Sequence, residues 1–140
     1  MYSYIYFFSS NIQKIIKLMN LEDVVKLPGR KDNIPDLLNS SECLILSSKF
    51  EGLPTVIMEA MACGCYVIAT DCGGCAEIMK DNFGILVPVS DSIALANAII
   101  SYLNFPQDFV CNSSKMAREI VVNNFSLDVA VKKWEEIYKL

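Results

Sequence analysis

Two glutamates, Glu51 and Glu59, are separated by seven residues in a segment that leads from an apolar run through a loop into a helical pattern. An ionised carboxylate only accepts hydrogen bonds, so each can bind both hydroxyl hydrogens of a sugar diol. The free N–H groups at a helix start form an anion site together with the positive end of the helix dipole. Gly52 allows a ligand to approach the backbone closely, because it has no Cβ. This combination suits a ligand in which phosphate joins two sugars.

The simpler interpretation is that each glutamate is a solvated charge, one on a loop and one on a helix surface. Taken alone, Glu51 fits that interpretation. Glu59 fits it less well, because it lies in the otherwise apolar stretch 56–62, where isolated charges are rarely buried without a partner. Both glutamates are therefore candidate site residues.

Six cysteines offer a different chemistry. Cys63 and Cys65, followed by the Cys72-Gly-Gly-Cys75 motif, could supply four thiolates to zinc. Cys72 and Cys75 also fit a redox dithiol at a strand-to-helix turn, where a thiolate would be stabilised. However, the spacing differs from that of a zinc ribbon, and Cys43, Cys63 and Cys65 lie in or beside apolar runs, where free cysteine acts as a small hydrophobe. A thiol-redox or zinc protein using Cys72 and Cys75 is thus one alternative, and no metal site is expected.

Short apolar runs alternate with helical patterns along the chain, which is typical of βα units and a parallel sheet. The expected strands are 24–27, 43–46, 66–70 and 85–87. Helices are expected at 11–20, 54–63, 75–80, 113–123 and 127–139, the last capped by Ser126. A short helix capped by Asn33 is expected to turn Ile34, Leu37 and Leu38 inward. Another helix, capped by Ser90 or Asp91, carries Ile93, Ala96, Ile100 and Leu103. We predict an α/β fold: a single open, parallel-sheet, Rossmann-like domain over residues 1–140, with C-terminal helices.

Several positions carry more specific expectations. The continuous apolar run 43–46 is typical of a strand buried on both faces. Pro54 suits the first helical position, because it has no N–H to leave unpaired. Gly64 suits the left-handed position that ends a helix. Trp134 and Tyr138 on the last helix are expected to pack in the core, and the alternative is that they dock a partner chain.

Composition excludes several classes of protein. A chain of 140 residues with 53% hydrophobic and 20% charged residues is not disordered. A net charge of −4 argues against a general nucleic-acid partner. The chain has no histidine, so it contains neither a Ser-His-Asp triad nor a His-ligated metal. No stretch is long and apolar enough to span a bilayer, and the apolar residues 2–8 lack the flanks of a secretory signal. We expect a cytoplasmic protein with at most peripheral contact at the inner membrane face.

The segment around the glutamates resembles the E-x7-E signature of the large retaining group of GT-B glycosyltransferases, family 4. The matching residues are Glu51-Gly-Leu-Pro and Glu59-Ala-Met-Ala. Further motifs follow in the same order as in the family: Leu44-Ile-Leu-Ser47, Ala62-Cys-Gly64, Val67 to Ile78 with Asp71, Gly73, Gly74 and Glu77, Gly84 to Pro88, Asp91-x-x-x-Leu95-Ala96, and Phe125-Ser126. The resemblance runs from about Leu21 to Tyr138, and it rests on this ordered series more than on any single motif.

The resemblance implies the donor-binding C-terminal half of a GT-B fold. Such an enzyme transfers a sugar from a nucleoside-diphosphate sugar to a polysaccharide, lipopolysaccharide or glycolipid acceptor, with retained configuration. Glu59 would hold the ribose hydroxyls, and Glu51, in the catalytic position, those of the donor sugar. Other donor-binding groups would be the backbone N–H groups of Gly52, Leu53, Thr55 and Val56, with Arg30 and Lys31 near the base. No metal or cofactor is expected, because the site would act by stabilising the leaving diphosphate.

The sequence also departs from the family pattern. The Arg and Lys that neutralise the diphosphate have no counterpart in residues 1–18, and the acceptor-binding N-terminal domain has none in the chain. Tyr66 stands where a proline is common. The first alternative function is therefore a non-catalytic nucleotide-sugar-binding fragment or subunit, which needs a separate acceptor domain as its partner.

Overall fold

The computed structural model describes residues 11–79 and 83–138. The chain divides into two compact units, Met1–Asp32 and Asn33–Leu140. In the first unit, residues 11–18 are helical, in agreement with the expected helix, and the helix ends in a turn. The expected strand at 24–27 is wrong: residues 22–24 form a turn, and residues 25–31 have no regular structure. An extended segment becomes a strand only where a neighbour completes its backbone hydrogen bonds.

The second unit contains a parallel sheet, in the order β1-β2-β3. Its strands are β1 (Cys43–Leu46), β2 (Tyr66–Thr70) and β3 (Gly84–Val87), close to the expected ranges. The register pairs Cys43 with Tyr66 and Val67 with Gly84. The central strand β2 is buried throughout, as a strand covered on both faces must be. The predicted α/β class with a parallel sheet is confirmed.

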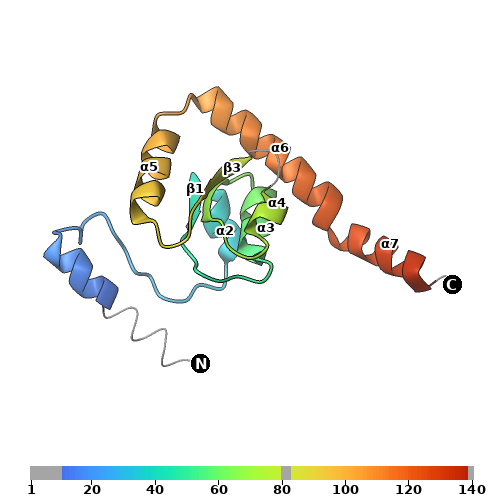
Figure 1. The fold of residues 1–140 in the computed structure, drawn as a ribbon, viewed down its shortest axis with the longest axis horizontal. Coiled ribbons are helices and arrows are strands. Elements are labelled where there is room, and N and C mark those ends of the chain that lie inside the picture. The colour runs from blue at the N-terminus through green and yellow to red at the C-terminus, as the bar shows by residue number, and fades with distance from the viewer. Residues whose placement is uncertain (1–10, 80–82, 139–140) are drawn as a thin grey trace. The chain divides into compact units, whose positions relative to one another are not determined.

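Helices cover both faces of the sheet. Their bounds are α2 (Ile34–Asn39), α3 (Thr55–Ala62), α4 (Cys75–Ile78), α5 (Ser92–Leu103), α6 (Gln107–Phe125) and α7 (Leu127–Tyr138). Figure 1 shows α5 on one side of the sheet, with α3, α4 and α6 on the other. Each side has its own core. The α3 side is built around Ile57, Met61, Val67, Cys75 and Ile78, and the α5 side around Tyr66, Ile68, Val87 and Ala98.

Helix ends follow local chemistry. Pro54 occupies the position before α3 and not its first helical position, one residue from the expectation. Gly64 has φ +73° and Cys65 N–H donates to the Ala60 carbonyl, the left-handed ending that was expected. Of the two candidate caps for α5, Asp91 is used: its carboxylate accepts from Ala94 N–H at 2.8 Å.

The burial of four side chains differs from the sequence expectation. Ile45 is 44% exposed and the other three residues of β1 are half-buried, so β1 is not buried on both faces; α5 packs on β2 and β3. Leu37 is also exposed, whereas Leu38 is buried. Trp134 and Tyr138 do not pack in the core: α7 has no buried residue, and the two rings stack on each other with centroids 5.8 Å apart.

The C-terminal helices differ from expectation in length as well. Helix α6 begins at Gln107, directly after Pro106, so it is longer than the predicted 113–123. No helix among residues 11–79 and 83–138 is long and apolar enough to cross a membrane.

Candidate functional site

The segment after β1 forms a loop over residues 47–54 that leads directly into α3. We call it the donor loop, after the role that the family resemblance implies for it. In open parallel sheets, ligands bind at the carboxyl ends of the strands, where this loop lies. Within the described part of the chain, the backbone N–H groups of Gly52, Leu53, Thr55 and Val56 have no hydrogen-bond acceptor. Unpaired N–H groups at a helix start attract anions. The structure thus places these four predicted site residues within one short segment, two in the donor loop and two at the start of α3.

The two glutamates lie in different surroundings. Glu51 is half-buried, and its Oε1 accepts a hydrogen bond from Ser48 Oγ at 2.6 Å. Its second carboxylate oxygen and its remaining lone pairs are available to a ligand. Glu59 is exposed on α3, so the apolar residues around it in sequence do not bury it. Both carboxylates can therefore accept hydrogen bonds from the hydroxyl groups of a ligand that binds from solvent.

Thr70, at the carboxyl end of β2, holds the donor loop to the neighbouring strand. Its buried hydroxyl lies 2.5 Å from the Ser48 carbonyl oxygen and 3.4 Å from that of Leu46. A hydroxyl has one hydrogen, so the shorter contact is the principal hydrogen bond. The motif range from Val67 to Ile78 includes Thr70, but the sequence analysis assigns it no role. Its position at the end of a strand indicates one, because the ends of adjacent parallel strands lie side by side.

Two glycines after β2 support the donor loop from the other side. Gly74 N–H donates to the Gly52 carbonyl at 2.8 Å. Gly73 has φ +54°, and a Cβ there would lie 1.7 Å from the Glu51 carbonyl oxygen. A Cβ on Gly74 would lie 2.8 Å from the Gly52 oxygen. Only glycine permits this approach, so the turn 71–74 fixes the backbone that carries Glu51.

The cysteines do not form a zinc site. Among residues 11–79 and 83–138, no three Cys, His, Asp or Glu side chains lie together in a way that could hold a metal ion. Cys72 Sγ and Cys75 Sγ do lie close, at 3.9 Å. Burial raises the pKa of the Cys75 thiol, the side-chain hydrogen bond with Cys72 and the charges of Cys72 and Glu51 add to this, and the hydrogen bond from the Cys72 backbone offsets part of it. The expected stabilised thiolate is therefore wrong for Cys75, because its site is apolar and carries negative charge.

Arg30 and Lys31, predicted to lie near the base, belong to the first unit. Both side chains are exposed, and Arg30 Nε lies 3.4 Å from Asp32 Oδ1. An ion pair between exposed side chains contributes little to stability, so it leaves Arg30 available to a ligand.

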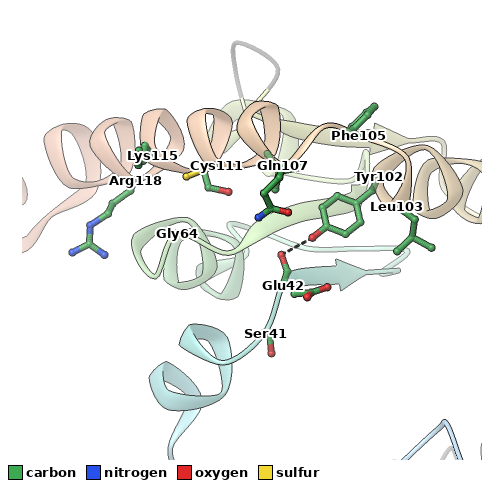
Figure 2. A pocket seen from close by; sticks show the side chains of 12 residues that line it. Ser41, Glu42, Gly64, Tyr102, Leu103, Phe105, Gln107, Cys111, Lys115 and Arg118 are labelled. Atoms are coloured by element: carbon green, nitrogen blue, oxygen red, sulfur yellow. Dashed lines mark hydrogen bonds between the residues drawn. The ribbon is translucent and has the colours of Figure 1, made fainter.

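A cavity of about 390 Å³ lies at the opposite side, where the amino ends of the strands meet; this side is called the amino edge, and the side of the donor loop the carboxyl edge (Figure 2). Its lining comes from the turns before β1 and β2, the end of α5 and the first half of α6. The Tyr102 hydroxyl donates to the Glu42 carbonyl at 3.0 Å across it. Arg118 donates to the Ala62 carbonyl at the end of α3. Tyr102 and Arg118 thus bind the protein's own backbone across the cavity wall.

The chain is similar in sequence to several curated proteins. N-acetyl-alpha-D-glucosaminyl L-malate synthase of Bacillus anthracis is 34% identical over 128 residues, which are 91% of this chain and 33% of that protein. The UDP-Gal:alpha-D-GlcNAc-diphosphoundecaprenol alpha-1,3-galactosyltransferase of Escherichia coli is 32% identical over 86% of this chain and 31% of its own length. The chain therefore spans about a third of the curated relatives that it matches.

A solved structure shows the same fold. The crystal structure of Anabaena Alr3699/HepE in complex with UDP-glucose superposes with a TM-score of 0.83 and 27% identity, over 94% of this chain and 37% of that one. The sequence model of the family described as "Glycosyl transferases group 1" matches residues 9–125, most of the chain. The donor loop and the sheet that carries it lie within this match, and the chain belongs to the group 1 glycosyl transferase family.

Proposed function

We propose that this chain is the donor-binding part of a retaining glycosyltransferase. It binds a nucleoside-diphosphate sugar for transfer to a polysaccharide or glycolipid acceptor. The observation that carries the proposal is the donor loop with the start of α3, where four unpaired backbone N–H groups follow the half-buried Glu51 along the chain. The HepE structure named for its complex with UDP-glucose supports a nucleotide-sugar ligand.

Each part of the loop has a proposed task. The N–H groups of Thr55 and Val56, at the start of α3, bind the diphosphate and stabilise its charge as it leaves. The carboxylate of Glu51 accepts hydroxyl hydrogens of the sugar, and Ser48 orients that carboxylate. Glu59, in the second turn of α3, accepts the ribose hydroxyls. No side chain here acts as a nucleophile, and the reaction needs no metal, so a chelator is expected to leave nucleotide binding unchanged.

Calorimetric titration of UDP and GDP into the 140-residue chain tests the proposal. Glu59→Gln keeps the shape of the side chain but removes its charge. Hydrogen bonds to a charged group are worth about 1.5–3 kcal/mol, so binding is expected to weaken by roughly ten- to a hundredfold. Glu119→Gln, at another exposed helical glutamate, is the matched control and should bind like the parent chain.

A deoxynucleotide sharpens the assignment of Glu59. If this carboxylate binds the ribose 2′-hydroxyl, 2′-deoxy-UDP should bind the parent chain more weakly than UDP does. The Glu59→Gln variant should then distinguish the two nucleotides much less. A folded chain that binds neither UDP nor GDP would contradict the proposal, and so would an unaltered affinity in Glu59→Gln.

The second candidate function is a non-catalytic binding subunit that needs a separate acceptor domain. It corresponds to the part of the curated relatives that the chain matches, about a third of their length. In that case the chain binds the donor, but it transfers or hydrolyses the sugar only when the acceptor domain is added. Turnover of UDP-glucose by the purified chain alone would refute this candidate and support the first.

A further inference from the structure

Cys72 and Cys75 form a close thiol pair between β2 and α4. Their Sγ atoms lie 3.9 Å apart, and a disulfide requires about 2.0 Å. Two glycines separate them, so the backbone between the cysteines can adjust as the sulfurs approach. The remaining displacement is within reach of side-chain rotation and a small movement of the turn.

The two thiols differ in access to solvent. Cys72 is 7% exposed and Cys75 is fully buried. Both cysteines belong to the buried core, and Cys72 is the less buried of the two, so an oxidant that enters from solvent meets Cys72 before Cys75. Burial also raises the pKa of the Cys75 thiol, which keeps Cys75 protonated in the reduced protein.

The thiol pair encloses the two glycines that support the donor loop. Gly74 N–H donates to the Gly52 carbonyl, and Gly73 packs against the Glu51 carbonyl with no space for a Cβ. A movement of the turn that brings Cys72 and Cys75 together therefore displaces the groups that hold the backbone of Glu51 and Gly52.

We propose that Cys72 and Cys75 are a site of reversible dithiol oxidation, and that their disulfide weakens nucleotide binding at the donor loop; the second part rests on the proposed function. The oxidant is the disulfide of a low-molecular-weight thiol, RSSR. The Cys72 thiolate attacks one sulfur of RSSR, which forms a mixed disulfide and releases RS⁻. Cys75 then attacks the Cys72 sulfur and releases the second RS⁻. The two cysteine protons convert both anions to RSH, so the two cysteines are oxidised by two electrons and RSSR is reduced.

The test uses the full chain carrying Cys111→Ser, because Cys111 is exposed and would react with the oxidant by itself. The chain is incubated with glutathione disulfide, the free thiols are alkylated, and the tryptic peptide 50–80 is analysed by mass spectrometry. We expect this peptide to lose two hydrogens, with Cys63 and Cys65 alkylated and Cys72 and Cys75 not. Cys63→Ser is the control that keeps the pair, whereas Cys72→Ser and Cys75→Ser each remove it.

UDP is then titrated into the reduced and the oxidised chain. Loss of one supporting hydrogen bond predicts about fivefold weaker binding after oxidation, which corresponds to about 1 kcal/mol. Reduction with dithiothreitol should restore the affinity, and Cys75→Ser should show no dependence on the oxidant. Faster amide exchange at Gly74 in the oxidised chain would report the same movement without any nucleotide.

The outcomes separate the two proposals. If the peptide from the oxidised chain contains no Cys72–Cys75 disulfide, the proposed oxidation site is wrong, whether or not the chain binds UDP. A disulfide that leaves both UDP affinity and Gly74 exchange unchanged overturns the coupling to the donor loop. A reduced chain that binds no UDP contradicts the proposed function, and the mass and exchange measurements then decide the thiol proposal alone.

Discussion

At the carboxyl edge of the sheet, hydrogen bonds and close glycine contacts hold the donor loop, whereas at the amino edge a cavity of about 390 Å³ remains open. At the amino edge, the Tyr102 hydroxyl and the Arg118 side chain bind backbone carbonyls of the protein itself. At the carboxyl edge, the backbone is fixed but several N–H groups of the loop are unpaired. The comparison teaches that volume alone does not identify the site; hydrogen-bond groups held in place without a partner are the better guide.

Gly73→Ala is expected to have the largest effect on this difference. The new Cβ would overlap the Glu51 carbonyl, and φ +54° disfavours any residue with a Cβ. We expect the free energy of unfolding to fall by about 2–4 kcal/mol and UDP binding to be lost. Urea denaturation and calorimetry measure the two effects.

Gly64→Ala is the matched control for that change. Gly64 also has a positive φ, of +73°, but a Cβ there meets no atom within 4 Å. The cost should be about 1 kcal/mol, from the backbone conformation alone, and UDP affinity should be retained. Equal effects of the two alanines on UDP binding would show that the contact with Glu51 does not position the donor loop.

Alkaline pH is expected to act mainly on the amino edge. Burial raises the pKa of the Cys43 thiol from 9.0 to about 12, and the neighbouring charge of Cys65 adds to this shift. Burial likewise raises the pKa of Cys65, Tyr66 and Tyr102. Above pH 9 these groups ionise in the unfolded chain before they do so in the folded one, so stability present at lower pH is lost as pH rises towards 12.

The size of the alkaline effect can be measured by urea denaturation between pH 8 and pH 11. Each fully affected thiol contributes a slope of about 1.4 kcal/mol per pH unit. Cys43→Ala should make the slope less steep, whereas the control Cys111→Ala, at an exposed cysteine, should not. A pH-independent stability over this range would contradict the burial of these groups.

Two conservative substitutions give the smallest effects and compare the edges directly. Thr70→Val removes the hydroxyl that binds the Ser48 carbonyl, and Tyr102→Phe removes the one that binds the Glu42 carbonyl. Each should cost about 1 kcal/mol of stability. Only Thr70→Val should also weaken UDP binding, by a few-fold, because only Thr70 holds the donor loop. A larger loss of binding in Tyr102→Phe would reverse the assignment of the two edges.

The parallel sheet and the helix after the donor loop could be predicted from sequence, because their signals are local. The apolar runs gave β1, β2 and β3 within one residue, and Gly64 marked the end of α3 through its backbone preference. The false strand at 24–27 shows where local signals fail, since an apolar run does not reveal whether a neighbouring strand exists. The exposure of Ile45 and of α7 depends on tertiary packing for the same reason.

The candidate site divides in a similar way. Residue types and spacing within one segment indicate Glu51, Glu59 and a helix start as candidates, and the family resemblance names the individual N–H groups. The support from Thr70, Gly73 and Gly74 arises only when the end of β2 meets the end of β1, and the raised pKa of Cys75 arises only from burial. Contacts between strands that are distant in sequence cannot be read from a single motif.

The exposed position of Trp134 has a consequence for spectroscopy. It is the chain's single tryptophan, it is 58% exposed on α7, and it stacks on Tyr138. Its fluorescence therefore reports the environment of α7 and changes little when the sheet unfolds. Tryptophan emission and far-ultraviolet circular dichroism should therefore give different denaturation curves for this chain. A blue shift of that emission would instead signal that a binding partner has covered α7.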